Sequence, residues 1–329
     1  MRVAVTGGTG YAGRYIVDAI VAAGHDVRVL VRNKSEPPDL PAAVESVGGT
    51  LDPDSDFSRL VDGADALVHA AYQHVAGRYR GGEGDDLAGF MRVNVGGSLA
   101  LLEAAQRAGV ERCVVFSSRA VYGRRPPGVR LTEDTAIAPD THYGAAKATL
   151  EAFVASFARQ DGWCICAIRP TGIYGLTWPA RRSKWLGLVR SLLDGDELVE
   201  ARAGTEVHGV DVARAVILLL QAPAESVAGR AFNCSDLVVS TRDIARHVAR
   251  LRGHDIKLPP AGDANALNVM TCEGLTALGL TFSGQALLEE TIGDLIALAR
   301  KTPGHPGVRA VSGADQNSAL ASSARTLEQ

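Results

Sequence analysis

A tyrosine and a lysine lie four residues apart in the sequence YGAAK, at Tyr143 and Lys147. At this spacing in a helix, the phenol and the ammonium share one face. A free phenol, with a pKa of about 10, is a poor base at neutral pH, but a nearby ammonium favours the phenolate. The pair therefore predicts an acid/base, Tyr143, tuned by Lys147. Such a pair suits hydride transfer between a nicotinamide and a carbonyl or alcohol, which requires a proton to move on or off the oxygen.

Two serines follow the apolar run CVVF, which ends at Phe116. Ligands of open α/β sheets bind at the carboxyl ends of the strands, so a hydroxyl there can hold a substrate oxygen. We predict that Ser118 makes this hydrogen bond. We expect the neighbouring Ser117 to contact the cofactor.

Three glycines, Gly7, Gly10 and Gly13, come directly after the first apolar run and directly before a helical pattern. A pyrophosphate needs backbone N–H groups without a Cβ in the way and the positive end of a helix dipole behind them. The spacing therefore predicts a dinucleotide site, with Tyr11 and Ala12 of the same turn in contact with the cofactor. The alternative is a simple tight turn between a strand and a helix.

The second apolar run ends in VLVRNK, which has cations and no carboxylate. An acidic side chain there would accept hydrogen bonds from the adenosine ribose of NAD, whereas a 2′-phosphate requires cations. Arg32 could stack on adenine and pair with this phosphate, with Lys34 as a second charge. We therefore favour NADP(H) and keep NAD(H) open; solvated loop cations are the alternative for both side chains.

Short apolar runs alternate with helical patterns from the first residue. This alternation predicts an α/β protein with a Rossmann-like, doubly wound parallel sheet. The predicted strands are residues 3–5, 27–31, 66–70, 113–116 and 164–168. The predicted helices between them are residues 12–23, 87–108 and 145–158.

The pattern changes after the sequence RP at 169–170, which predicts a smaller, discontinuous C-terminal substrate lobe. We expect residues 1–175 to form an NAD(P)-binding Rossmann domain to which residues 205–235 return. Residues 176–204 and 236–302 would form the lobe. Residues 303–329, rich in Pro, Gly, Ser and Ala, are expected to be a disordered tail.

The composition excludes several classes of partner. The 329 residues carry a formal charge of -3, and 46% are hydrophobic and 22% charged. No basic block indicates nucleic acid, and no apolar run approaches the roughly 20 residues that span a bilayer. The five cysteines form no CxxC pair, so no metal site is predicted. We expect a cytoplasmic protein with neither nucleic acid nor membrane as a partner.

Six motifs, in chain order, resemble the short-chain dehydrogenase/reductase superfamily in its extended, NAD-dependent epimerase/dehydratase branch. They are TGGTGYAG at 6–13, DALVHAA at 65–71, NVGGS at 94–98, FSSRAVYG at 116–123, YGAAK at 143–147 and RPTGIYG at 169–175. The resemblance covers residues 1–300 and selects Ser118 over Ser117 as the active serine. Further site residues that it implies are Ala70 and Ala71 lining the cofactor, Asn94 supporting the active-site helix, and Pro170, Gly172 and Ile173 passing the nicotinamide.

Some positions depart from the family pattern. The family's GDL turn reads GTLD here, so either Thr50 or Asp52 would contact the adenine. Nucleotide-sugar members usually have an asparagine and an arginine where this chain has Gly172 and Gly204, which puts a sugar-nucleotide substrate in doubt. The resemblance also implies a homodimer that pairs residues 87–108 with residues 143–159 across a two-fold axis.

These observations together predict an NAD(P)-dependent oxidoreductase that transfers hydride to or from a carbonyl, alcohol or sugar-like substrate. An epimerase of sugars or sugar nucleotides with the same residues is the first alternative. A cofactor-binding regulator that has lost turnover is the second, although such proteins would be expected to lose Tyr143 or Lys147. Dehydratases of this branch tend to have an acidic pair after the active serine, where this chain has RA, so dehydration is disfavoured.

Overall fold

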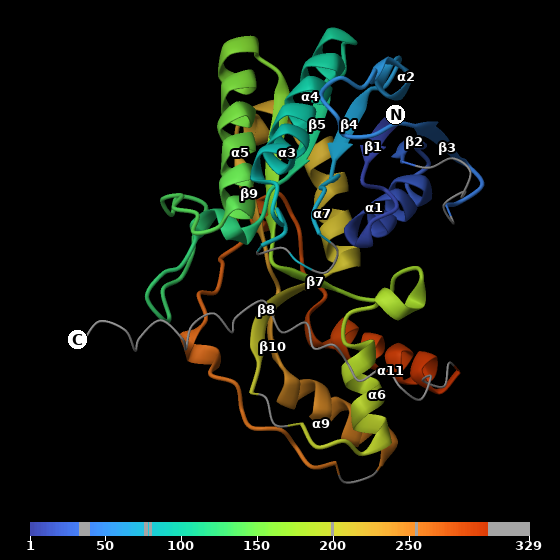
Figure 1. Cartoon of the computed structure of the whole chain (residues 1–329), viewed down its shortest axis with the longest axis vertical. Helices are drawn as coiled ribbons and strands as arrows, with labels where there is room; N and C mark the ends of the chain where they lie inside the picture. The colour runs from blue at the N-terminus through green and yellow to red at the C-terminus, as the bar shows by residue number, and fades with distance from the viewer. Residues whose placement is uncertain (33–39, 76–77, 79–80, 199–200, 254–255, 302–329) are drawn as a thin grey trace.

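A seven-stranded parallel sheet forms the larger part of the molecule (Figure 1). The structure is a computed structural model that describes residues 1–32, 40–75, 78, 81–198, 201–253 and 256–301. The strand order is β3-β2-β1-β4-β5-β6-β9. The strands are β1 (Arg2–Thr6), β2 (Asp26–Val31), β3 (Val44–Gly48), β4 (Ala66–His69), β5 (Arg112–Phe116), β6 (Cys164–Pro170) and β9 (Ala231–Cys234).

Helices cover both faces of this sheet because its central strands are apolar on both sides. In β1, Val3 and Val5 pack with one set of helices, and Ala4 between them packs with the other. One set contains α1 (Tyr11–Ala22) and α7 (Gly209–Gln221). The opposite set contains α2 (Ser58–Val61), α4 (Ser98–Arg107) and α5 (His142–Asp161). This arrangement confirms the predicted Rossmann-like fold.

A second, three-stranded sheet lies beyond the carboxyl ends of the large sheet (Figure 1). It consists of β10 (Leu237–Ser240), β8 (Ala203–His208) and β7 (Gly172–Tyr174), in that order. The helices α6 (Leu186–Asp194), α9 (Thr241–Arg252) and α11 (Gly284–Lys301) share a separate apolar core beside it. The division at residues 175 and 205 stays a prediction, and residues 303–329 lie outside the described residues.

Short elements complete the chain. They are α3 (Leu87–Met91), α8 (Ala224–Val227), α10 (Glu273–Ala277), the π-helical η1 (Arg92–Gly97), and the 3-10 turns η2 (Arg119–Tyr122), η3 (Ala180–Arg182) and η4 (Ala264–Ala266). None of the helices in the described part of the chain combines the length and apolar character that crossing a bilayer requires.

Two helices differ from the sequence prediction. Residues 87–108 form not one regular helix but α3, η1 and α4 in succession, and the wider π-helical turn contains Asn94. The helix predicted at 145–158 begins earlier, at His142, because the Thr141 hydroxyl accepts a hydrogen bond from Gly144 N at 3.0 Å and caps it.

The close contact between α1 and the first turn can be tested at Gly13. A Cβ there would lie 2.0 Å from the Gly7 carbonyl oxygen. We expect Gly13→Ala to lower the free energy of unfolding by about 1–3 kcal/mol, because this backbone contact leaves no room for a methyl group. Gly293→Ala is the control: it lies in α11 with nothing within 4 Å of the added Cβ, and should raise that free energy by up to about 1 kcal/mol. Equal values for the two variants in urea denaturation would contradict the packing argument.

Candidate active site

The glycine turn and the end of β4 lie in direct contact. Gly7 has a φ of +75°, and an added Cβ would lie 2.6 Å from the backbone of Ala70 and Ala71. Gly10 N donates to Gly7 O at 2.8 Å, which closes the turn at the start of α1. The structure thus brings the three predicted glycines together with both predicted alanines. Exposed backbone at the start of a 12-residue helix fits a bound pyrophosphate.

Tyr143 and Lys147 both belong to the first turns of α5, where they contact the same aromatic ring. The Lys147 side chain is buried, and its Nζ donates to the Phe116 carbonyl oxygen at 2.7 Å, at the end of β5. Lys147 Nζ lies 4.7 Å from the centre of the Tyr72 ring, and the Tyr143 ring centre lies 5.0 Å from it. Burial lowers the pKa of Lys147 to about 8, although Glu151 acts in the opposite direction.

The two serines after β5 have different surroundings. The Ser117 hydroxyl is buried and donates to the Glu151 carboxylate, which also accepts from Arg169 Nε at 2.8 Å and Nη2 at 2.7 Å. This side chain is therefore held in an internal network, and only its backbone could contact a cofactor. Ser118 is half-buried, and its Oγ accepts from Ala120 N at 3.1 Å. No described residue accepts the Ser118 hydroxyl proton, which leaves that proton for a ligand.

A buried hydrogen-bond chain supports Asn94 from the sheet. His69 Nδ1 lies 2.7 Å from Thr6 Oγ1, and its Nε2 lies 2.8 Å from Ser98 Oγ. The Ser98 hydroxyl donates to the Asn94 carbonyl oxygen at 2.6 Å. The Asn94 side chain accepts from Gln73 N and donates to Gln73 O, both at 2.8 Å. This chain fixes the backbone next to Tyr72, and so holds Tyr72 against Lys147.

The predicted adenine and 2′-phosphate contacts follow the strands β2 and β3. Arg32 is exposed at the end of β2, and Lys34 lies outside the described residues. The Asp52 carboxylate binds Arg92 through both oxygens, with Nη2 3.1 Å from Oδ1. Thr50 Oγ1 lies 3.2 Å from Ser55 Oγ. Both candidates for the adenine contact therefore already have partners in the protein.

The last predicted segment joins the large sheet to the small one. Pro170 is the buried final residue of β6, and Gly172 and Ile173 begin β7. Tyr11, at the start of α1, donates from its hydroxyl to Gly175 O at 2.6 Å. This contact holds the start of α1, which follows the glycine turn, against the segment that follows the strand predicted to pass the nicotinamide.

Three further side chains around the site are not among the residues that the sequence predicts to form it. Tyr72 lies against Lys147, which is 75 positions away. Glu151 accepts from Ser117, and Arg169 donates to Glu151, which is 18 positions away. A charged residue at the end of an apolar strand indicates a buried partner of opposite charge. Arg169 in the strand CICAIRP is such a residue. Spacing rules do not report such distant pairs.

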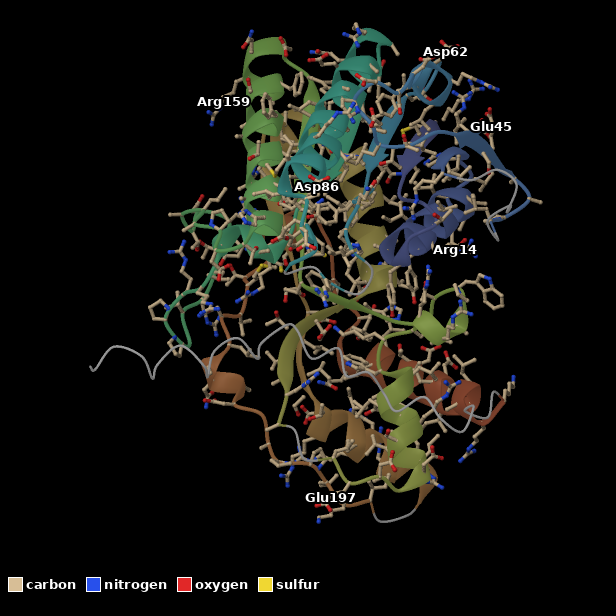
Figure 2. All side chains as sticks on the ribbon, viewed as in Figure 1. Arg14, Glu45, Asp62, Asp86, Arg159 and Glu197 are labelled. Carbon is tan, nitrogen blue, oxygen red and sulfur yellow. The ribbon has the colours of Figure 1, made fainter. Side chains whose placement is uncertain are left out.

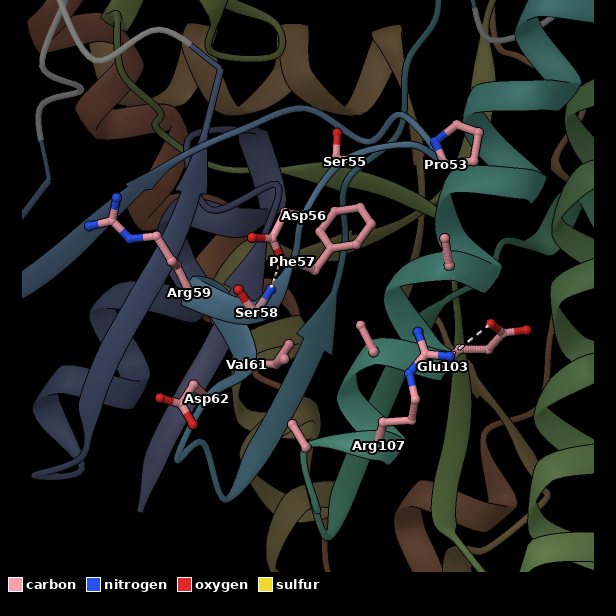
Figure 3. A pocket seen from close by; sticks show the side chains of 13 residues that line it. Pro53, Ser55, Asp56, Phe57, Ser58, Arg59, Val61, Asp62, Glu103 and Arg107 are labelled. Atoms are coloured by element: carbon pink, nitrogen blue, oxygen red, sulfur yellow. Dashed lines mark hydrogen bonds and ion pairs between the residues drawn. The ribbon is translucent and has the colours of Figure 1, made fainter.

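Cavities elsewhere in the described residues do not contain this cluster. One, of about 590 Å³, lies between α2 and α4 and is lined by Phe57, Arg59, Glu103 and Arg107 among others (Figure 3). No predicted site residue lines it. Within the described residues, no group of three His, Cys, Asp or Glu side chains could hold a metal ion.

Comparison with known proteins identifies the family. The model of the NAD dependent epimerase/dehydratase family matches residues 3–235. The chain belongs to this family.

Relatives in the family include a 3 beta-hydroxysteroid dehydrogenase/Delta 5-->4-isomerase of Mycobacterium tuberculosis (strain CDC 1551 / Oshkosh), 36% identical over 183 residues, which are 53% of this chain and 47% of that protein. A dTDP-glucose 4,6-dehydratase of Streptomyces niveus is 29% identical over 288 residues, 78% of this chain and 83% of that protein. The chain spans about half the length of the curated relatives that it matches at more than 30% identity.

Solved structures share the fold. A UDP-glucose 4-epimerase from Thermotoga maritima, with UDP-glucose, superposes with a TM-score of 0.74 at 22% identity, over 92% of this chain and 99% of that one. A UDP-glucose 4-epimerase from Thermus thermophilus, in complex with NAD, gives 0.72 at 25% identity over 91% and 99%. These likenesses support the predicted extended fold with its C-terminal lobe.

The buried His69 predicts a pH dependence of stability. Burial, together with the Lys147 charge, lowers the pKa of His69 from 6.5 to about 3. Between these values the unfolded chain binds one more proton than the folded chain, so stability falls as pH falls from 6.5 towards 3. We expect His69→Gln, which cannot titrate, to flatten the dependence of the unfolding free energy on pH by about 1.4 kcal/mol per pH unit in this window. Parallel curves from urea denaturation at pH 6.5 to 4 would contradict this.

Proposed function

We propose that the chain is an NAD(P)-dependent oxidoreductase that moves hydride to or from a carbonyl or alcohol with Ser118, Tyr143 and Lys147. The observation that carries this proposal is the buried Lys147 ammonium, bonded to Phe116 O at the carboxyl end of β5 one helical turn from Tyr143. Family membership supports it, as do relatives named as a hydroxysteroid dehydrogenase and a ketoreductase.

The residues around the glycine turn fit a dinucleotide. The phosphates would lie against backbone that is free of side chains, because a Cβ at Gly7 or Gly13 would collide with neighbouring backbone atoms. This turn lies at the N-terminus of α1, where the N–H groups and the helix dipole favour an anion. When bound, a pyridine nucleotide supplies or accepts the hydride. Gly10 and the adjoining Tyr11 and Ala12 would complete its phosphate site, and Ala70 and Ala71 would line the opposite wall.

The chain's own residues would handle the proton. In the reductive direction the Tyr143 hydroxyl gives its proton to the substrate oxygen, and in the oxidative direction the phenolate takes it back. Lys147 favours the phenolate by its charge, because at pH 7 an ammonium with a pKa of about 8 is mostly protonated. Ser118 donates its hydroxyl proton in a hydrogen bond to the same substrate oxygen and so fixes its position.

An epimerase is the second candidate. The same three residues would move the proton while a bound pyridine nucleotide accepts the hydride of a sugar alcohol and returns it to the other face of the resulting ketone. Relatives named as UDP-glucose 4-epimerases favour it. A regulator without turnover is disfavoured because Tyr143 and Lys147 are both present and share the ring of Tyr72.

Tyr143→Phe tests the catalytic proposal. We expect this variant to lose about 10²- to 10⁴-fold in the rate of NADPH oxidation with a panel of carbonyl substrates, because the proton donor is removed. Calorimetric Kd values for NADPH should stay within about twofold of the wild type, since the ring remains. The matched control is Tyr122→Phe. It also removes a tyrosine hydroxyl, but one that belongs to the internal network and accepts from Arg169 at 2.6 Å. Equal rates for wild type and Tyr143→Phe would overturn the proposal.

We propose that Arg32 binds the 2′-phosphate and so favours NADPH over NADH. Its exposed guanidinium ends β2, where a 2′-phosphate could be paired, although neighbouring solved structures contain NAD. We expect Arg32→Ala to weaken NADPH binding by about tenfold and NADH binding by less than about twofold, because only the former carries the phosphate. Calorimetry with both cofactors measures the difference. Equal weakening of both would remove Arg32 from the phosphate site.

We infer a homodimer that pairs residues 87–108 with residues 143–159 across a two-fold axis, and a cytoplasmic location. Phe153, exposed to 38% on α5, is an apolar side chain that such an interface could cover.

A further inference from the structure

A partly buried ion pair lies where the two sheets meet. Lys184 Nζ donates to the Glu206 carboxylate, and Glu206 in β8 is opposite Gly172 in β7. A Cβ on Gly172 would lie 2.5 Å from Glu206 Oε2 and 2.8 Å from Lys184 Nζ. The pair therefore fills the space that a side chain at position 172 would take.

This pair contacts the start of α1, and its neighbour Gly172 follows β6 of the large sheet. Gly172 follows the carboxyl end of β6, and β6 is the neighbour of β5, whose last carbonyl holds Lys147. Lys184 N donates to the Tyr11 hydroxyl at 3.0 Å, which connects it to the glycine turn. In Figure 1, β7 and β8 cross below the carboxyl ends of the large sheet, between this sheet and the lobe. Ligands of such folds bind in that crevice.

The pair has unused hydrogen-bonding capacity. Glu206 Oε2 accepts from Lys184, and none of the described residues donates to Oε1, although the Glu206 side chain is only 9% exposed. On the same face of β8, Gly204 has no side chain to cover Oε1: an added Cβ would lie 3.1 Å from it. The Lys184 side chain is 31% exposed, and one of its three N–H donors is used by Glu206. An acceptor and donors therefore stand side by side and open to a ligand.

Stability alone does not explain this pair. Burial raises the pKa of Glu206 even against the Lys184 charge, which reports the cost of removing this carboxylate from water. Trp185, next along the chain, has a φ of 68° and its ring lies 5.4 Å from Lys184 Nζ. A left-handed conformation in a bulky residue is a strained geometry, typical of sites that position functional groups.

We propose that Lys184 and Glu206 form a substrate subsite for neighbouring hydroxyl groups of a neutral sugar or polyol. One hydroxyl donates to Glu206 Oε1, and the next accepts from Lys184 Nζ. The ligand is neutral because the two side chains together carry no net charge. An anionic group placed at the subsite meets the carboxylate, so a uronate carboxylate there is disfavoured. The inference rests on the proposed oxidoreductase and names the substrate class for it.

Calorimetric titration of the cofactor-saturated protein tests this subsite. The neutral probes are methyl α-D-glucopyranoside, xylitol and myo-inositol, and the anionic probe is D-glucuronate. We expect at least one neutral probe to bind about tenfold or more tightly than D-glucuronate. Glu206→Gln should weaken that neutral probe by about tenfold and strengthen D-glucuronate, because it removes the carboxylate charge.

Two variants serve as controls. Glu197→Gln removes a carboxylate from the exposed Lys257–Glu197 pair at the far end of the lobe (Figure 2), where the side chains are 75% and 59% exposed, and should change every Kd by less than about twofold. If Glu206→Gln does not fold, Lys184→Gln/Glu206→Gln removes both charges together and should show the same loss for neutral probes.

The inference is overturned if D-glucuronate binds more tightly than every neutral probe, if no neutral probe binds, or if the Glu206 variants leave neutral binding unchanged. NADH and NADPH are titrated first. A protein that binds neither cofactor contradicts the proposed function itself. A protein that binds a cofactor but prefers D-glucuronate contradicts only the subsite.

Discussion

The buried ammonium of Lys147 constrains the rest of the site. Removing a cation from water is costly, and its depressed pKa reports this cost. The Phe116 carbonyl, the face of the Tyr72 ring and the more distant Glu151 charge offset it. Since Phe116 ends β5 and Tyr72 follows β4, the ammonium fixes α5 to two strands of the sheet at once. Tyr143 is one turn away on the same helix, so its place follows from that of Lys147.

The irregular helix between β4 and β5 is the second support of this arrangement. An uninterrupted α-helix over residues 87–108 would turn Asn94 by a different angle, whereas the π-helical turn points it at Gln73. Such wider turns are frequent at functional sites because they redirect one side chain. Buried polar groups from His69 to Ser98 lock this direction, because each of them needs its partner when water is excluded.

The sequence predicts the large sheet well because its strands are buried on both faces and contain continuous apolar runs. Strand β3, VESVG, has a single buried residue, Val47, so no such run marks it, and β7 and β8 are short or polar. The glycine turn and the Tyr–Lys pair are local in sequence, so spacing suffices to predict their proximity. Tyr72 and Glu206, in contrast, contact residues that are distant in the sequence and that only the fold brings near. For Glu206 the sequence does offer a signal, which is a glutamate inside the strand AGTEVH.

The helix that follows the glycine turn also makes the contacts to the segment that leads into the lobe. Tyr11 and Tyr15, one turn apart on α1, donate to the carbonyl oxygens of Gly175 and Leu176. A Cβ at Gly209 would lie 2.2 Å from the Tyr15 ring, so the backbone where β8 passes into α7 is pressed against the same helix face. Any shift of α1 on occupation of the turn must therefore move the segment that leads to Lys184, because tightly packed contacts transmit displacement rather than absorb it. One rigid element thus connects the glycine turn to the segment that leads to Lys184.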